Sequence, residues 1–328
     1  MDLVQRFGNE IEEINKALKD ALMEKEPREL YDAARHLPLA GGKRLRPLLV
    51  LLASRAVGGS GYDALPFGLA IEIIHNFTLV HDDIMDRSTL RRGVETVHVK
   101  FGEPTAIIAG DVLFAKAFEV MHKLKVDDSI FRRLNGLLVK TVKEICEGQQ
   151  LDMEFEKRTD VKEKDYLTMI EKKTAALFSC STEGGGIIGG GSEKSIKALA
   201  NYGKYLGLAF QIRDDYLDLC GKEEEIGKRI GNDIRDGKKT IIIAHAVENL
   251  DDKGKRILQS VLGNRNASDD DISRLVGLLK EAGSIDYARE KALFYSKLAA
   301  KELDKVEGKM EVLDDLKEIA NYAATREK

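Results

Sequence analysis

The positions of the prolines limit the fold of this chain more than any other feature of its sequence. All five lie between Pro27 and Pro104, so no later residue lacks the backbone N–H that a helix interior needs. Beyond Pro104, apolar residues recur at spacings of three and four, which is the period of a helix with one buried face. The longest stretches with this period are 105–124, 128–148, 196–219 and 273–303. The pattern predicts an all-α bundle of roughly ten or more helices.

Punctuation residues support the same prediction. The stretches "SEKS" and "SDDDIS" are typical of helix N-termini, and no Asn-Gly or Asp-Gly turn lies between alternating apolar runs. The glycine-rich stretch "EGGGIIGGGS", residues 183–192, lacks the pattern of a phosphate-binding loop and has no preceding strand. We therefore expect it to connect two helices, and we predict no strands.

Length and composition predict a single domain over residues 1–328. The chain is 43% hydrophobic and 33% charged, which allows a large core, and no linker or low-complexity segment divides it. Its 52 basic and 56 acidic residues give a net charge of −4, which does not favour binding to nucleic acid.

The remaining bulk features predict a cytoplasmic location. Cys146, Cys180 and Cys220 lie far apart and include no C-x-x-C pair, which is typical of reduced thiols. The N-terminus is acidic and amphipathic, unlike a signal peptide. No apolar run reaches the roughly 18 residues that span a bilayer, so we expect no transmembrane segment.

Two acidic clusters interrupt helical stretches that otherwise look buried. In each D-D-x-x-D cluster the first and last aspartates are one turn apart, so their carboxylates share one helix face about 6 Å apart. A solvated helix end would explain a single cluster, but two clusters that follow apolar runs favour bound cations, because buried like charges are costly. The clusters are Asp82, Asp83 and Asp86 in "HDDIMD", and Asp214, Asp215 and Asp218 in "RDDYLD".

The ligand chemistry of the clusters indicates Mg²⁺. Oxygen-only carboxylate ligands suit hard cations, and the glycine-containing calcium loop of the D-x-D-x-D-G type is absent from the sequence. Mg²⁺ keeps several waters and usually binds through one or two carboxylates together with substrate phosphates. We therefore expect several Mg²⁺ ions to hold one diphosphate between the clusters.

Basic residues gather near both clusters. Each group alone would be an ordinary solvated surface patch, but their repeated position beside the aspartates favours a second phosphate-bearing substrate. The groups are Lys43, Arg44 and Arg46 in "GGKRLRP", Arg91 and Arg92 in "STLRRG", and Lys228, Arg229, Lys238 and Lys239 in "GKRIGNDIRDGKKT".

A di-iron centre is an alternative, because the chain contains two E-x-x-H pairs. Glu72 with His75 and Glu119 with His122 have the spacing that di-iron helical bundles use. That alternative explains neither aspartate cluster nor the arginines. His75 lies two turns before Asp82, on the same helix face, where it could donate a hydrogen bond to a phosphate.

The ordered motifs resemble the trans-type isoprenyl diphosphate synthases, most closely the archaeal-type short-chain enzymes that make geranylgeranyl diphosphate. The matching motifs are "GGKRLRP", "HDDIMD" with its following "RRG", "GQQLD", "KKTAALF", "FQIRDDYLD" and "GNDIRDGKKT". The resemblance implies an all-helical homodimer in which helices surround a deep central cavity. It also implies that the two aspartate clusters face each other across the mouth of that cavity and hold three Mg²⁺ ions.

The resemblance assigns roles residue by residue. Asp82, Asp86 and Asp214 match direct metal ligands, whereas Asp83, Asp215 and Asp218 match residues that act through water or through those ligands. The residues around the allylic diphosphate are Lys173, Thr174, Gln211, Lys228 and Lys238, with Arg91 on its diphosphate. The pocket for isopentenyl diphosphate matches Lys43, Arg46, His75 and Arg92. Gln149 and Asp152 match a polar pair that lines the cavity.

The implied reaction is a head-to-tail condensation. Metal and cationic side chains stabilise the leaving diphosphate, and the allylic cation alkylates isopentenyl diphosphate inside a cavity that excludes water. Lys173, Thr174 and Gln211 match groups whose dipoles stabilise the cation. The expected primers are dimethylallyl, geranyl and farnesyl diphosphates.

The family resemblance also implies the length of the product, through two residues that lie about one helical turn before the first cluster. Phe77 and Thr78, five and four positions before Asp82, match the floor of the product tunnel and favour a C20 product, with a C15 or mixed C15/C20 product as the alternative. A class I terpene cyclase and a non-catalytic partner subunit are more distant alternatives. Both D-D-x-x-D motifs are intact, which argues against the cyclase and against the non-catalytic subunit.

Overall fold

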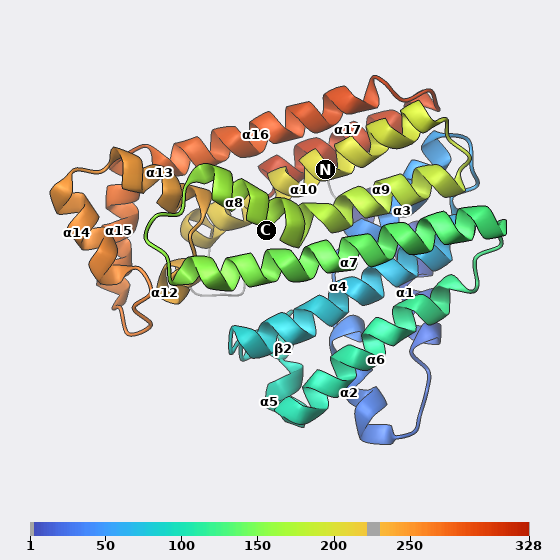
Figure 1. The fold of residues 1–328 in the computed structure, drawn as a ribbon, viewed down its shortest axis with the longest axis horizontal. Helices are drawn as coiled ribbons and strands as arrows, with labels where there is room; N and C mark the ends of the chain where they lie inside the picture. The colour runs from blue at the N-terminus through green and yellow to red at the C-terminus, as the bar shows by residue number, and fades with distance from the viewer. Residues whose placement is uncertain (1–2, 222–229, 328) are drawn as a thin grey trace. The chain divides into compact units, whose positions relative to one another are not determined.

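A computed structural model describes residues 3–221 and 230–327 (Figure 1). The chain divides into two compact units, each assembled from three separate stretches of sequence. Unit 1 comprises Met1–Val142, Cys180–Ala200 and Lys305–Leu316, and unit 2 comprises Lys143–Ser179, Asn201–Asp304 and Lys317–Lys328. Four of the five boundaries fall inside helices, which are α7 (Asp128–Glu156), α9 (Ala176–Ile188), α10 (Glu193–Cys220) and α17 (Met310–Thr325).

Unit 1 is built around the pair α4 and α6, which lie side by side (Figure 1). Helices α2, α3 and α5 contact one or both members of this pair. The elements of unit 1 before α7 are α1 (Leu3–Ala21), α2 (Arg28–Leu39), α3 (Leu45–Ala56), the 3₁₀ turn η1 (Tyr62–Ala64), α4 (Leu65–Met85), β1 (Leu90–Arg91), β2 (Val94–Glu95), α5 (Val97–Phe101) and α6 (Glu103–Met121).

The helix α4 is an apolar core helix. By length and hydropathy the segment Tyr62–Met85 meets the criterion for a membrane span, contrary to our expectation, but 61% of its apolar window is buried. Ile71, Ile73 and Ile74 are fully buried, and α4 contacts α1, α2, α3, α5 and α6. Packing in the core of unit 1 therefore accounts for its apolar sequence.

A short hairpin follows α4, and the prediction of no strands missed it. The strands β1 and β2 pair antiparallel, with Leu90 opposite Glu95 and Arg91 opposite Val94. The turn between them has positive φ at both central residues, 53° at Arg92 and 77° at Gly93, as a tight two-residue hairpin turn requires. This turn directs two arginines back toward α4.

Unit 2 packs short helices on long ones around its own core. Its cluster of buried side chains includes Tyr166, Ile212, Ile242, Leu275 and Ala288. Besides its parts of α7, α9, α10 and α17, unit 2 contains α8 (Glu163–Ile170), the π-helical turn η2 (Glu171–Ala175), α12 (Asn232–Asp236), α13 (Ile241–Asn249), α14 (Asp252–Val261), α15 (Asp269–Glu281) and α16 (Ser284–Leu303).

The all-α prediction is confirmed, with two local corrections. The periodic stretch 273–303 contains two helices, because Gly283 adopts φ 70° and separates α15 from α16. In the glycine-rich stretch, Gly184 and Gly185 lie inside α9, where a Cβ would overlap Phe67 or Val50, and only its last residues connect helices. Close packing rather than a turn explains the first of these glycines.

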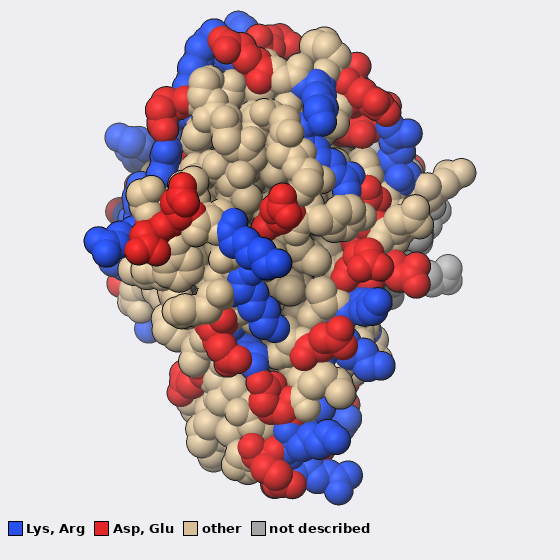
Figure 2. Space-filling view, turned by 90° about the vertical axis from the view of Figure 1, so that its right-hand side faces the viewer, with Lys and Arg blue, Asp and Glu red and all other residues tan. Residues whose placement is uncertain are grey.

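The surface and the cysteines agree with the bulk composition. On the face shown in Figure 2, basic and acidic side chains alternate, and no broad area of one sign appears. A mixed surface of this kind does not favour a polyanionic partner. Cys146, Cys180 and Cys220 form no disulfide.

Candidate active site

The first acidic cluster closes α4 in unit 1. The backbone N–H of Asp86 donates to the carbonyl of Asp82 at 2.8 Å, which fixes their one-turn spacing. Both side chains are half-buried, whereas Asp83 is 1% exposed and accepts a hydrogen bond from Arg91 Nε at 2.7 Å. The outer two carboxylates therefore share one helix face, and the middle one points into unit 1.

A cluster of basic side chains lies in the same unit. Arg46 Nη1 lies 3.3 Å from His75 Nε2, and Arg92 Nη1 donates to Asn76 Oδ1 at 3.1 Å. Arg46, His75 and Arg92 are half-buried, and Lys43 is exposed in the turn before α3. These are the residues predicted for isopentenyl diphosphate, and the structure brings Arg46 together with His75 and attaches Arg92 to α4.

Arg44 does not belong with this group. Its guanidinium is 3% exposed and donates to Glu72 Oε1 at 2.7 Å, the Pro38 carbonyl at 2.6 Å and Asn15 Oδ1 at 2.8 Å. Its backbone has φ 51°, an uncommon conformation for a residue other than glycine. Arg44 therefore fixes the turn that presents Lys43, and its contacts with Glu72 and the Pro38 carbonyl account for its charge without a phosphate.

The glutamates of the di-iron alternative have other partners. Glu72 is 2% exposed and neutralises Arg44. Glu119 Oε1 accepts from Lys116 Nζ at 3.0 Å, and His122 Nδ1 lies 3.0 Å from the Phe118 carbonyl. These contacts assign Glu72 to the core of unit 1 and place Glu119 and His122 at the end of α6.

The surroundings of His75 in this basic cluster favour the neutral form of its imidazole ring. Burial lowers the pKa of His75 well below its ordinary value, and Arg46, Arg92, Arg91 and Arg44 lower it further. Burial likewise lowers the pKa of Arg92 to about 10, so its guanidinium stays charged at neutral pH. Neutral His75 can accept from Arg46 through Nε2, while the other ring nitrogen keeps a proton to donate.

The two predicted chain-length residues lie on α4 next to α6. The ring of Phe77 is half-buried and contacts the rings of His81 and Phe114, with centroids 4.9 and 5.5 Å away. Thr78 Oγ1 donates to the His75 carbonyl at 2.9 Å, so its methyl group is the part left to face a ligand. Phe77 therefore belongs to an aromatic cluster between α4 and α6.

In unit 2, a π-helical turn presents two predicted site residues. Lys173 and Thr174 lie in η2, which joins α8 to α9, and π turns are frequent at functional sites. A Cβ at Gly148 on α7 would overlap the backbone nitrogen of Lys173, and one at Gly207 on α10 would overlap Ala175. Two glycines therefore let neighbouring helices approach the backbone of this turn.

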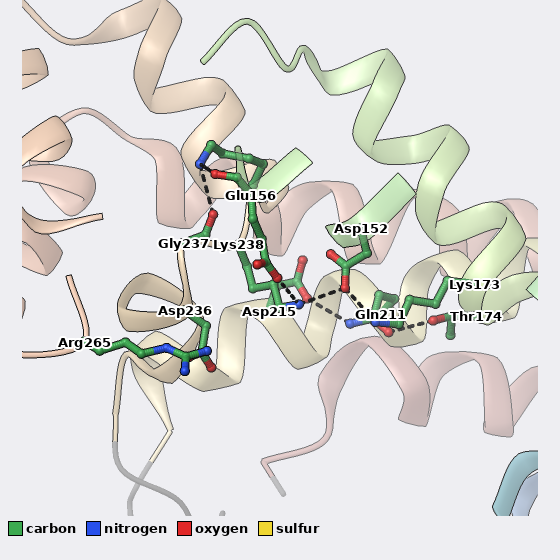
Figure 3. A network of polar contacts seen from close by, with 11 residues as sticks. Asp152, Glu156, Lys173, Thr174, Gln211, Asp215, Asp236, Gly237, Lys238 and Arg265 are labelled. Carbon is green, nitrogen blue, oxygen red and sulfur yellow. Dashed lines mark hydrogen bonds and ion pairs between the residues drawn. The ribbon is translucent and has the colours of Figure 1, made fainter. Parts of the chain in front are cut away.

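One carboxylate joins the two predicted lysines (Figure 3). Asp152 Oδ2 accepts from Lys173 Nζ at 2.6 Å and from Lys238 Nζ at 3.0 Å. Lys238 also donates to Glu156 Oε1 at 2.7 Å. Burial alone would raise the pKa of Asp152, but the two lysines hold it below its ordinary value. The Asp152 carboxylate is therefore ionised and shared by both lysines.

A chain of polar side chains continues from the π turn to the second acidic cluster (Figure 3). Thr174 Oγ1 donates to Gln211 Oε1 at 2.8 Å, and Gln211 Nε2 donates to Asp215 Oδ1 at 2.9 Å. Tyr166 donates to Asp215 Oδ2 at 2.6 Å. Burial raises the pKa of Asp215 to about 7 despite these bonds, with Asp214 adding to the effect.

The outer aspartates of the second cluster are half-buried and have different partners. Asp214 forms an ion pair with Arg326, which follows α17. Asp218 Oδ2 accepts from the backbone N–H of Asp233 at 3.1 Å, so it holds the start of α12, the helix before Lys238. Lys228 and Arg229 lie outside the described residues.

The comparisons with known proteins agree with this arrangement. A family model described as polyprenyl synthetase matches residues 27–279. The geranylgeranyl diphosphate synthase of Methanosarcina mazei is 41% identical over 333 residues, covering 100% of this chain and 99% of that protein. The crystal structure of geranylgeranyl pyrophosphate synthetase from Pyrococcus horikoshii aligns with a TM-score of 0.94 at 45% identity, covering 99% of this chain and 98% of that one. A geranylgeranyl pyrophosphate synthase from Corynebacterium glutamicum, complexed with isoprenyl diphosphate and magnesium, has a TM-score of 0.88 at 26% identity, covering 96% and 99%.

The fold is all-α, and it carries two aspartate clusters with groups of lysine and arginine side chains nearby. These features define a class of protein, the prenyl diphosphate synthases. The chain belongs to the polyprenyl synthetase family. The resemblance inferred from the sequence is therefore confirmed.

Three residues at the site were missed by the sequence reasoning. Gly148 could have been found, because an interior glycine in a long helix signals close backbone approach. Tyr166 looks like any core aromatic residue, and Arg326 is 112 positions from Asp214 along the chain, so neither had a sequence signal.

Proposed function

We propose that this protein is a magnesium-dependent prenyltransferase that joins an allylic diphosphate head-to-tail to isopentenyl diphosphate and forms geranylgeranyl diphosphate. The observation that supports this most is the repeated arrangement of aspartates. In each cluster two half-buried carboxylates lie one turn apart, with a buried aspartate beside the first. The names of the relatives support the C20 product.

The donor set fits Mg²⁺ that is shared with a diphosphate. Among the residues that the structure describes, no group of three or more His, Cys, Asp or Glu side chains could hold a metal ion alone. Pairs of carboxylates together with phosphate oxygens are the usual Mg²⁺ ligands. Asp82, Asp86 and Asp214 would be direct ligands, and three ions per site is the number that the family resemblance implies. When bound, Mg²⁺ stabilises the leaving diphosphate as a Lewis acid.

The side chains of unit 2 would bind and ionise the allylic substrate. Lys173 and Lys238 supply two ammonium groups that already share one anion, Asp152. A diphosphate can take the place of that anion, because its ionised oxygens accept the same charge-assisted hydrogen bonds. Gln211, fixed between Thr174 and Asp215, can direct oxygen dipoles at the cation that forms. Lys228 keeps the role that the resemblance implies.

The side chains of unit 1 would bind isopentenyl diphosphate. Arg46 and Arg92 are charged, half-buried donors, and Lys43 is an exposed third cation. Neutral His75 can add one N–H donor without taking a proton from the substrate. Arg91, paired with Asp83, lies beside the first metal-binding pair and would reach the allylic diphosphate from there.

Product length would be limited by Phe77 and Thr78. Phe77 packs against Phe114, so its ring is held rather than free to turn aside from a growing chain. A farnesyl or mixed C15/C20 product is the second candidate, and it would require that this ring stop the chain one isoprene unit earlier.

We also infer a homodimer from the outer face of α6. Ile107, Ile108 and Phe114 are 42%, 51% and 37% exposed, and apolar groups gathered on one helix favour a subunit contact. Nucleic acid is not an expected partner, no transmembrane segment is expected, and the expected location is the cytoplasm. The interleaved segments of the two units support one domain over residues 1–328, because independent domains are usually continuous.

The proposal is tested by incubating the protein with Mg²⁺, labelled isopentenyl diphosphate and farnesyl diphosphate, followed by chromatography of the dephosphorylated products. We expect a C20 alcohol that disappears when a chelator is added. Parallel reactions with dimethylallyl and geranyl diphosphates should end at C20 as well.

Other outcomes separate the alternatives. Products that stop at C15 from the shorter primers would favour a farnesyl synthase. A cyclic hydrocarbon formed without isopentenyl diphosphate would indicate a terpene cyclase. Label that stays unincorporated with every primer would contradict the proposal and favour a non-catalytic subunit.

A further inference from the structure

The residue that follows α17 folds its side chain onto α10, beside the second acidic cluster. Arg326 is 7% exposed, although only two residues follow it in the sequence. Its guanidinium forms an ion pair with Asp214, donates to the Phe210 carbonyl at 3.4 Å and lies 4.1 Å from the centroid of the Phe210 ring. Three contacts therefore hold one cationic group at Asp214.

The backbone of Arg326 is anchored as well. Arg213 Nε donates to the Arg326 carbonyl at 2.9 Å, and Arg213 is itself 8% exposed. Ala323 and Ala324 in the last turn of α17 are almost fully buried. These contacts show that the position of Arg326 is built into unit 2.

The contact between Arg326 and Asp214 is incompatible with full use of that carboxylate by a metal. A guanidinium on Oδ1 occupies a lone pair that a divalent cation would otherwise use and repels that cation, so the two compete for the carboxylate. The guanidinium also has one unsatisfied hydrogen-bond donor, because Arg326 Nε is buried with no partner in the described part of the chain. A buried donor without a partner favours a second position for the side chain.

We propose that Arg326 is a built-in cation that neutralises Asp214 when no metal is bound and competes with the metal for it. This inference rests on the proposed function in one respect, the role of Asp214 as a metal ligand. Arg326 lies outside residues 27–279, the part that matches the family model. It sets how much metal the second cluster needs.

The test is a titration with Mn²⁺ in the presence of a saturating non-reactive allylic diphosphate analogue, with free Mn²⁺ followed by electron paramagnetic resonance. All proteins carry Asp82→Asn, which weakens the first cluster. Arg326→Gln removes the charge and keeps an amide donor for the Phe210 carbonyl. We expect its dissociation constant for Mn²⁺ to fall about tenfold, because a charged contact with the ligand is lost.

Two controls distinguish competition from a general charge effect. Lys317→Gln removes a positive charge from α17, the helix that precedes Arg326. Lys317 Nζ pairs with Asp304 at 3.1 Å, so this variant should leave Mn²⁺ affinity unchanged. Arg326→Lys keeps the charge but not the planar donor group, so its affinity should lie between wild type and Arg326→Gln. Should the glutamine variant fail to fold by circular dichroism, the lysine variant makes the same comparison.

A double variant locates the effect. In an Asp214→Asn background, Arg326→Gln should no longer change Mn²⁺ affinity, since the shared ligand is gone. Unchanged or weaker affinity in Arg326→Gln, or no bound Mn²⁺ in any variant, would overturn the inference. The assay needs no turnover, and C20 formation by the wild type is measured separately, so failure of the inference and failure of the proposed function are distinguishable.

Discussion

Asp83 and Asp215 occupy the same position in the two acidic clusters, and both are buried, but they are neutralised differently. Asp83 is paired with the guanidinium of Arg91 at 2.7 Å. Asp215 receives bonds from two uncharged groups, Tyr166 and Gln211, and burial raises its pKa to about 7. One repeated motif therefore contains a charged inner residue in unit 1 and a partly protonated one in unit 2.

The outer residues of the clusters are more alike. Asp82, Asp86, Asp214 and Asp218 are all half-buried, and each pair lies one helical turn apart. The aspartates of each motif therefore lie on two different helix faces. The first and last aspartates stay available to a cation, while the second connects the helix to its own unit.

Replacing an outer aspartate should have the largest effect on catalysis. We expect Asp82→Ala or Asp214→Ala to lower kcat by about 10³-fold or more, because the leaving diphosphate loses a metal ligand. The measurement is steady-state C20 formation, with circular dichroism to confirm the fold. Asp111→Asn, which changes an exposed aspartate on α6, should behave like the wild type. Near-normal rates from either alanine variant would contradict the metal assignment.

In unit 2, the close approach of Gly148 to the backbone of Lys173 supports the π turn, and the described residues around the first cluster have no such contact between a glycine and the backbone. Gly148→Ala should push the backbone of Lys173 away from α7 and lower kcat by about 10²-fold, the usual effect of small misplacements in a site. Gly136→Ala on the same helix has open space for the new methyl group and should stabilise the protein by about 0.5–1 kcal/mol. Equal behaviour of the two variants in activity and thermal denaturation would remove the π turn from the account.

The inner aspartates should differ in stability when each becomes asparagine. Asp83→Asn leaves the Arg91 guanidinium without its counter-ion and should cost about 2 kcal/mol. Asp215→Asn should not destabilise the protein at pH 7 and should raise its free energy of unfolding, because it removes a carboxyl whose ionisation in the unfolded state opposes folding there. Urea denaturation with a chelator present measures both, and equal costs would mean that the two clusters do not differ in this way.

The same pair of variants predicts a difference in pH dependence. In the folded protein the pKa of Asp215 is about 7, above an unfolded value of about 3.9, so the folded state binds more protons between these values. The contribution of Asp215 to stability therefore falls as pH rises from about 4 to 7. Asp215→Asn should remove this slope from urea denaturation curves, and a slope that persists would show that another group titrates there.

The smallest effect on rate, but a clear one on product, is expected from the ring next to the first cluster. Phe77→Ala removes the ring that packs against Phe114 and should allow products longer than C20. Chromatography of the dephosphorylated products measures the change, and Leu79→Ala on the same helix is the control that should keep C20. An unchanged product distribution would return Phe77 to ordinary core packing.

The parts predicted from the sequence are those set by local periodicity. The 3.6-residue period placed the long helices and put Asp82 and Asp86 on one face, because side-chain direction in a helix follows from spacing alone. The lysine pair Lys173 and Lys238 was reached through motif resemblance, and Lys228 lies outside the described residues. None of this required knowledge of tertiary contacts.

The parts that were missed depend on contacts between distant segments. Arg44 looks like its neighbours in "GGKRLRP", and only the buried carboxylate of Glu72 shows that it belongs to the core. The π turn at Glu171–Ala175 has no composition of its own, since it follows from close approach at Gly148 and Gly207. Arg326 meets Asp214 only because α17 ends there.

The central claim is that both clusters bind metal through their outer aspartates, and the most direct test is to count the ions. Bound Mn²⁺ can be measured by electron paramagnetic resonance with a non-reactive allylic diphosphate analogue at saturation, for the wild type, Asp82→Ala and Asp214→Ala. The account predicts about three ions per wild-type chain, as Mg²⁺ sites shared with diphosphate allow, and fewer in each variant. The same number of ions in all three proteins would contradict it.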